Sequence, residues 1–276
     1  MNHDSSGSIA FIGGGNMARS LIGGLVARGH DAGAIRVAEP VVPVREALAA
    51  DFGVSVFADG AQAVEGASTW VLATKPQVLR PVCETLADAA QRTRPLVVSI
   101  AAGITAAQLE RWLGGGIPVV RAMPNTPALL GAGVTGLFAS EAVDDAGRSM
   151  AERLLAAAGR TVWIDHEAQM DAVTAVSGSG PAYVFLLAEA MIDAGIGEGL
   201  PADAARTLAL QTILGAARML TESDVDAAEL RRRVTSPNGT TQAALEAFEA
   251  GGFRTLVSDA IHAARVRGAE LAAAHD

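Results

Sequence analysis

The sequence contains little of what disulfide, metal or membrane chemistry requires. Cys83 is the only cysteine, which excludes an internal disulfide and any metal site built from several cysteines. The five histidines have no metal-ligand spacing, so we expect no metal. No apolar run approaches the roughly 20 residues that span a bilayer, and the polar segment 1–7 does not resemble a secretory signal. These absences predict a cytoplasmic protein with no membrane partner.

Positive charge is also scarce. The chain has 21 basic against 30 acidic residues and a net charge of −9 at pH 7, which argues against a nucleic-acid partner. Lys75 is the only lysine. A general preference for arginine would leave one lysine by chance, but Lys75 follows an expected strand and precedes Pro76. We therefore favour the explanation that position 75 needs a compact ammonium rather than a planar guanidinium.

Hydrophobic residues make up half of the 276 positions, enough for one large domain or two modest ones. Up to about residue 165, short apolar runs alternate with helical patterns. The expected strands are 8–12, 35–38, 70–73, 96–100, 117–123, 134–138 and 161–164, and the clearest expected helices are 77–90, 105–113 and 144–158. This alternation predicts an α/β fold in residues 1–165, with a Rossmann-like, doubly wound parallel sheet.

From residue 166 to 276 the patterns are helical, which predicts a second, all-helical domain. Pro181 and Pro201 suit helix starts, and a regular apolar stripe runs along 253–264. Alanine-rich helices with wide apolar faces often pack against another subunit, so we expect at least a homodimer. A self-contained helical bundle is the alternative.

The most informative segment is 8–18, where an apolar run leads into Gly13-x-Gly15-x-x-Ala18 and then into a helical pattern. This is the strand, glycine turn and helix of a dinucleotide-binding unit. Gly13 permits the tight turn, Gly15 lets a pyrophosphate approach the backbone, and Ala18 keeps the helix close to the strand. The phosphates would lie at the positive end of the helix.

Further polar loops follow the expected strands at 74–76, 101–103 and 124–127, and should gather at the carboxyl edge of the sheet. Two more loops, 177–181 and 235–241, precede helices in the second domain. Their free N–H groups and hydroxyls suit a small carboxylate. Ordinary helix capping is the alternative explanation for each loop taken alone.

Four segments in these loops share their order with one family: 12–18 (IGGGNMA), 73–77 (ATKPQ), 177–183 (SGSGPAY) and 234–241 (VTSPNGTT). The chain resembles pyrroline-5-carboxylate reductase over about residues 8–271. The resemblance implies reduction of 1-pyrroline-5-carboxylate to L-proline, the last step of proline biosynthesis, with NADPH or NADH as cofactor. It also implies a helical domain that dimerises by interleaving helices, and dimers that commonly assemble to decamers.

The resemblance also implies the site residues. It places the pyrophosphate on Gly13, Gly15, Asn16, Met17 and Ala18, and the nicotinamide half beside Ala73, Lys75, Pro76, Ala101 and Ala102. It places the substrate carboxylate on Gly239, Thr240 and Thr241, and Ser177 is a further expected substrate contact. Thr241 would also hydrogen-bond the ring nitrogen, which makes it the expected catalytic residue.

Two positions need separate comment. Asn238 stands where the family usually has glycine, although asparagine tolerates left-handed backbone angles better than most residues. Glu39 ends an expected strand, where an acid normally accepts hydrogen bonds from a ribose 2′-OH and repels a 2′-phosphate. This favours NADH, but Arg36 or Arg45 would neutralise a phosphate if either faced it, so the preference stays open.

Two alternative functions compete with this interpretation. A β-hydroxyacid dehydrogenase also joins a Rossmann domain to a helical one, but uses a catalytic lysine in the helical domain, where this chain has none. A dinucleotide-sensing or scaffold protein would bind the cofactor without needing the two polar loops of the second domain.

Overall fold

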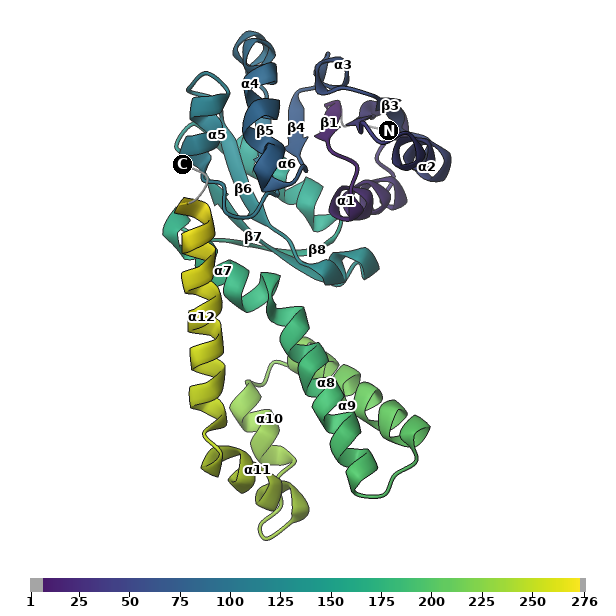
Figure 1. Ribbon diagram of the computed structural model, residues 1–276, viewed down its shortest axis with the longest axis vertical. Helices are drawn as coiled ribbons and strands as arrows, with labels where there is room; N and C mark the ends of the chain where they lie inside the picture. The colour runs from purple at the N-terminus through teal and green to yellow at the C-terminus, as the bar shows by residue number, and fades with distance from the viewer. Residues whose placement is uncertain (1–6, 274–276) are drawn as a thin grey trace. The chain divides into compact units, whose positions relative to one another are not determined.

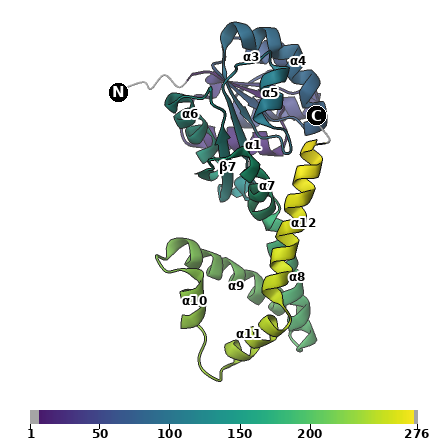
Figure 2. The same ribbon diagram turned by 90° about the vertical axis from the view of Figure 1, so that its left-hand side faces the viewer.

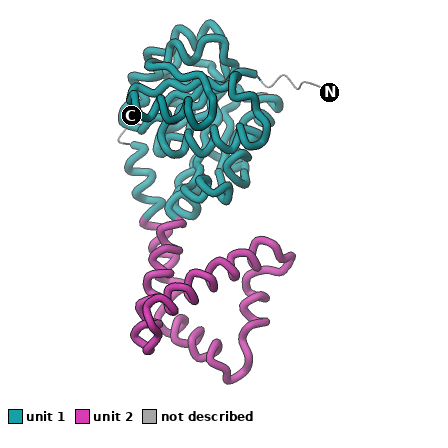
Figure 3. The backbone as a smooth tube through the Cα atoms, turned by 90° about the vertical axis from the view of Figure 1, so that its right-hand side faces the viewer, with its two compact units in different colours: residues 1–179, 264–276 teal, residues 180–263 magenta. Residues whose placement is uncertain are grey.

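The computed structural model describes residues 7–273 and divides the chain into two compact units (Figure 3). One unit contains residues 1–179 and 264–276, and the other contains residues 180–263. The boundary at 165 expected from the sequence lies just after the last strand, which ends at Trp163, whereas the compact units divide after Ser179. The division into domains 1–165 and 166–276 stays a prediction.

The first unit is built on one eight-stranded sheet (Figure 1). Its strand order is β3-β2-β1-β4-β5-β6-β7-β8, and all pairs are parallel except β6 with β7. The strands are β1 (Ile9–Ile12), β2 (Ile35–Ala38), β3 (Ser55–Phe57), β4 (Thr69–Leu72), β5 (Leu96–Ser99), β6 (Val119–Met123), β7 (Gly133–Ala139) and β8 (Gly159–Trp163). The prediction of a doubly wound, mainly parallel sheet is confirmed.

The antiparallel pairing of β7 corrects the expectation of a wholly parallel sheet. A parallel neighbour needs a crossover of a dozen or more residues, usually with a helix. The connection from Met123 to Gly133 contains only a short 3₁₀ turn, Thr126–Leu130, so the chain reverses direction there. The sequence showed two apolar runs at this place but not their relative direction.

Helices cover both faces of the sheet (Figure 2). Alternate residues of β1 point to opposite faces, since Phe11 belongs to one core cluster and Ala10 to the other. The first cluster includes side chains of α1 (Asn16–Ala27), α2 (Val42–Phe52) and α6 (Asp145–Ala156), and the second includes side chains of α3 (Gly60–Val64), α4 (Pro76–Thr93) and α5 (Ala106–Trp112). This layering leaves the carboxyl ends of the parallel strands free for ligands.

From residue 167 to 273 the described chain contains helices and turns, as the sequence predicted. After α7 (Met170–Val173) and a π-helical turn (Thr174–Gly178) come α8 (Gly180–Gly197), α9 (Ala202–Glu222), α10 (Ala227–Arg233), α11 (Thr240–Ala250) and α12 (Phe253–Ala273). Many of their apolar side chains are exposed in a single chain, among them Phe185, Leu186 and Leu256. These helices therefore do not bury their apolar faces within one subunit.

One helical segment is apolar enough to matter for the membrane question. The 31 residues Glu167–Gly197 are long and apolar enough to span a bilayer, by length and composition alone. The expectation of no such segment was wrong because it counted uninterrupted apolar runs, while alanine and glycine between the large residues keep this helix apolar. A core or interface helix of a globular protein meets the same criterion, so the observation is weak evidence for a membrane.

Candidate active site

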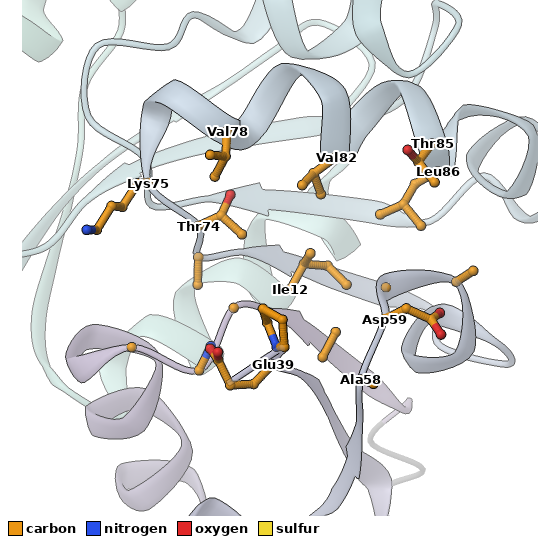
Figure 4. Close-up of a pocket in the computed structure, with 18 residues that line it drawn as sticks. Ile12, Glu39, Ala58, Asp59, Thr74, Lys75, Val78, Val82, Thr85 and Leu86 are labelled. Carbon is orange, nitrogen blue, oxygen red and sulfur yellow. The ribbon is translucent and has the colours of Figure 1, made fainter. Parts of the chain in front are cut away.

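A cavity of about 860 Å³ lies where β1, β2, β3 and β4 end (Figure 4). This volume is in the range of roughly 300–1,000 Å³ that is usual for small-molecule sites. The loops after these strands form much of its wall, and one side of α4 forms the rest. It is lined by Ile12, Gly13, Gly14, Gly15, Ala38, Glu39, Pro40, Ala58, Asp59, Gly60, Ala61, Ala73, Thr74, Lys75, Val78, Val82, Thr85 and Leu86. The cavity therefore occupies the edge predicted for a dinucleotide.

Two of the three glycines in the turn after β1 have different physical roles. Gly13 has φ +106°, and a Cβ there would lie 2.7 Å from the Ala73 carbonyl oxygen, so both its conformation and its surroundings require glycine. At Gly15, which is exposed, a Cβ would meet nothing within 4 Å. Nothing in the protein therefore fills the space above Gly15, which is what a cradle for a phosphate group needs.

Glu39 lies at this turn, as its position after β2 predicted. It is 8% exposed, and each carboxylate oxygen accepts a backbone hydrogen bond: Oε2 from Gly14 N–H at 2.9 Å and Oε1 from Val41 N–H at 2.9 Å. These bonds hold the carboxylate against the glycine turn at the cavity wall. A carboxylate oxygen has two lone-pair sites, so it can still accept a hydroxyl of a ligand.

Thr74 provides a second test of whether a polar ligand fits the cavity. Its hydroxyl oxygen is buried and has no hydrogen-bonding partner among the described residues. Buried polar atoms in proteins are nearly always hydrogen-bonded, because leaving one unpaired costs about 1–3 kcal/mol. Thr74 lines the same cavity as Gly15 and Glu39, so a polar ligand bound there is positioned to satisfy it.

The structure gathers some of the predicted cofactor residues and leaves others outside. Five of them line this cavity together: Gly13, Gly15, Glu39, Ala73 and Lys75. The remaining predicted residues, Asn16, Met17, Ala18, Pro76, Ala101 and Ala102, are not among its lining residues. Ala18 is 1% exposed and belongs to the core between α1 and the sheet, which is the packing role expected for the third fingerprint position.

Sequence reasoning missed several residues of this cavity. Asp59 follows β3, a three-residue strand too short to recognise from its pattern. Val78, Val82 and Leu86 lie on one side of α4, and their spacing of four residues was the available signal. Thr74 stood inside a loop that had been recognised, but a hydroxyl left without a partner becomes visible only in three dimensions.

A partly buried ion pair joins β6 to the segment that follows the sheet. Arg121 of β6 has a side chain that is 6% exposed, and its Nη1 lies 3.1 Å from Oε1 of Glu167. The same oxygen accepts the Ala106 N–H at 2.7 Å, at the start of α5. This network ties the loop after β5, which contains Ala101 and Ala102, to the start of the helical segment.

Ser177, an expected substrate residue, lies in the π-helical turn. Its hydroxyl donates to the Val173 carbonyl at 2.9 Å, and its own carbonyl accepts from Asn125 Nδ2 at 3.1 Å. Asn125 Oδ1 also accepts the Val134 N–H at 2.9 Å, so Asn125 links this turn to β7. In this arrangement the Ser177 hydroxyl offers lone pairs to a ligand rather than a proton.

The loop before α11 forms an open helix N-terminus in the second unit. Gly239 is the N-cap residue and no side chain caps the helix, so the first N–H groups of Thr240 and Thr241 are not taken by a capping side chain. A Cβ at Gly239 would lie 3.1 Å from the Ser236 carbonyl oxygen, which makes glycine the residue that fits without a shift. This N-terminus has the features of a carboxylate site.

Asn238 occupies the left-handed region of backbone angles, with φ +59°. Gln242 supports it, since its side-chain oxygen accepts the Asn238 N–H at 2.8 Å and its amide donates to Glu246 at 2.8 Å. We expect Asn238→Ala to lower the free energy of unfolding by about 1–2 kcal/mol, because alanine is strained in this region. Asn238→Gly is the control and should leave stability unchanged or slightly raised in urea unfolding. Equal losses in both variants would contradict the role of backbone strain.

Two family models match the chain. The model described as "Pyrroline-5-carboxylate reductase dimerisation" matches residues 167–271, and that described as "NADP oxidoreductase coenzyme F420-dependent" matches residues 8–103. Their boundaries separate the glycine-turn half from the helical half, in the order that the sequence predicted.

Whole-length relatives agree with these models. The pyrroline-5-carboxylate reductase of Pseudomonas aeruginosa is 55% identical over 97% of this chain and 98% of its own length. The solved structure of a pyrroline-5-carboxylate reductase from Coxiella burnetii is 43% identical with a TM-score of 0.94, covering 96% of this chain and 98% of that one. The Plasmodium falciparum pyrroline carboxylate reductase, solved with NADP bound, is 27% identical with a TM-score of 0.83, covering 96% of this chain and 98% of that one.

Proposed function

The chain belongs to the pyrroline-5-carboxylate reductase family, and we propose that two backbone cradles, at Gly13–Ala18 and Gly239–Thr241, hold its cofactor and its substrate. The enzyme is an oxidoreductase of the CH–NH group that reduces 1-pyrroline-5-carboxylate to L-proline with NAD(P)H, the last step of proline biosynthesis. This assignment removes the dehydrogenase and scaffold alternatives. The observation that carries the proposed cofactor site is the open space above Gly15, in the same cavity that the Thr74 hydroxyl lines without a hydrogen-bonding partner among the described residues.

In the first cradle, the residues of the turn bind and orient the cofactor. Gly13 sets the turn, and the N–H groups of Asn16, Met17 and Ala18 at the start of α1 would bind the pyrophosphate. Ala73, Lys75 and Pro76 would hold the nicotinamide half, together with Ala101 and Ala102. The bound nicotinamide supplies the hydride that the imine carbon accepts.

In the second cradle, the start of α11 holds the substrate. Gly239, Thr240 and Thr241 receive the carboxylate through their N–H groups, and Ser177 is a further substrate contact. The Thr241 hydroxyl hydrogen-bonds the ring nitrogen and orients the C=N bond. A protonated cyclic imine is already a strong hydride acceptor, so the protein needs to position it rather than activate it. That requirement explains why a reductase needs no histidine–aspartate pair at this site.

The enzyme forms oligomers. We propose a homodimer in which the helices of the two subunits interleave, and we propose that these dimers assemble further into decamers. The exposed apolar side chains of α8, α9 and α12 support this, since a partner subunit would cover them. On this proposal the segment Glu167–Gly197 is apolar because it faces protein rather than lipid. The proposed location is the cytoplasm.

A spectrophotometric assay tests the function directly. The purified full-length protein is mixed with pyrroline-5-carboxylate, and the loss of absorbance of NADH or NADPH is followed. We expect oxidation of the cofactor that depends on both components and yields proline. Cofactor binding without turnover would contradict the proposed reaction and favour a sensing role.

A further inference from the structure

We propose that Glu39 makes this enzyme select NADH over NADPH. The inference deepens the proposed function, because it takes the cavity at the glycine turn as the cofactor site. Glu39 ends β2 and lines this cavity, at the position where Rossmann folds meet the adenosine ribose. Relatives of this chain include one solved with NADP bound, so we do not attribute the preference for NADH to the whole family. We attribute it to Glu39 and its surroundings in this chain.

The carboxylate is fixed in place rather than free to turn away. Its two oxygens accept the Gly14 and Val41 N–H groups, each at 2.9 Å, and its backbone N–H donates to the Phe57 carbonyl at 2.9 Å. The remaining lone pairs can accept ribose hydroxyls, which are hydrogen-bond donors. A 2′-phosphate at the same place would bring acceptor oxygens and negative charge against the Glu39 carboxylate. This contact is repulsive, and the two hydrogen bonds hold the carboxylate in place.

The two arginines near β2 do not provide a phosphate site. Arg36 donates to the Ala63 and Gln62 carbonyls at 2.8 and 2.6 Å, and its guanidinium lies 4.4 Å from the Phe57 ring centroid. Arg45 donates to the Glu39 carbonyl at 2.7 Å. Neither side chain lines the cavity.

The charges that do line the cavity are unfavourable for a second phosphate. Asp59 adds another carboxylate, and among the described lining residues Lys75 is the one cation. Figure 4 shows Lys75 and Asp59 at opposite ends of the cavity, with Glu39 between them. A 2′-phosphate beside the Glu39 carboxylate would form a like-charge pair that no cation balances, which lowers the affinity for NADPH substantially. The ribose diol of NADH would instead donate hydrogen bonds to this carboxylate.

The test compares the two coenzymes on the intact enzyme by two readouts. Dissociation constants of NADH and NADPH are measured by fluorescence titration without substrate, and kcat/KM is measured with pyrroline-5-carboxylate. We expect NADPH to bind at least about tenfold more weakly than NADH, with kcat/KM in the same order. Equal or tighter binding of NADPH would overturn the inference. If neither coenzyme binds, the proposed cofactor site itself fails, which is a separate outcome.

Variants locate the effect. Glu39→Gln keeps the length of the side chain and removes its charge. Glu39→Ser removes the whole carboxylate, and it serves as a second variant in case the glutamine amide N–H clashes with the Gly14 or Val41 N–H. Both should shift the ratio of the two dissociation constants toward NADPH by at least about tenfold. Glu46→Gln, on the exposed side of α2, makes the same change in net charge outside the cavity and should leave the ratio unchanged. A ratio unmoved in both Glu39 variants, or moved equally in Glu46→Gln, would refute the role of Glu39.

Discussion

Replacing Gly15 with alanine is expected to raise the dissociation constant for NAD(P)H about 10- to 100-fold while the protein stays folded. The added methyl group meets no protein atom within 4 Å, so the proposed pyrophosphate is what it displaces. Overpacking by one methyl costs about 1–3 kcal/mol, and each 1.4 kcal/mol is a factor of about ten in affinity. Fluorescence titration with NADH and NADPH measures the loss. The free energy of unfolding in urea should change by less than about 1 kcal/mol, since the one cost to the folded protein is that alanine caps the helix less well than glycine.

Gly13→Ala is the matched comparison, because it adds the same methyl group two residues earlier. There the methyl lies 2.7 Å from the Ala73 carbonyl oxygen and the backbone has φ +106°. We expect a loss of about 3 kcal/mol or more in the free energy of unfolding, as well as weaker cofactor binding. A Gly15→Ala enzyme with unchanged affinity would show that the pyrophosphate does not lie over Gly15.

Thr241→Val is expected to lower kcat/KM for pyrroline-5-carboxylate about 100-fold and to leave the dissociation constant of the cofactor within about twofold. Valine keeps the branched shape at the second position of α11 and removes the hydroxyl proposed to orient the imine nitrogen. Loss of one well-placed hydrogen bond in a transition state typically costs a factor of about 10²–10³. Steady-state kinetics at saturating cofactor separate this effect from cofactor binding.

Thr241→Ser provides the rescue, since it restores the hydroxyl without the methyl group. It should recover most of the activity lost in Thr241→Val. If the valine enzyme turns over at the normal rate, or if serine does not restore activity, the hydroxyl is not what orients the nitrogen. A parallel loss of cofactor affinity would instead point to a structural effect of the substitution.

The sequence and the structure agree best where the evidence is local. The strand, glycine turn and helix of residues 9–27 follow from apolar periodicity and from a turn that only glycine can make. The helix expected at 105–113 is also present, and Thr105 and Gln108 form a capping box at its start, with the Thr105 N–H donating to Gln108 Oε1 at 2.7 Å. Glu39 was found from its place after a strand. Each of these features depends on residues within a few positions of one another.

Other features escaped the sequence because their parts are far apart along the chain. The pairing of Arg121 with Glu167 spans 46 residues, and the side of α4 that closes the cavity meets turns from three other strands.

By itself the sequence determined the glycine turn and the order of a Rossmann half before a helical half, because short-range sterics and periodicity encode these features locally. It indicated the family and the reaction only through the resemblance of four motifs to pyrroline-5-carboxylate reductase. Only the tertiary structure decided that β7 runs antiparallel to β6, that Thr74 is left unpaired at the cavity wall, and that Arg36 and Arg45 are held by backbone carbonyls. The reason is that a side chain's partner is fixed by packing between distant segments, and no local pattern records which donors and acceptors packing has already used.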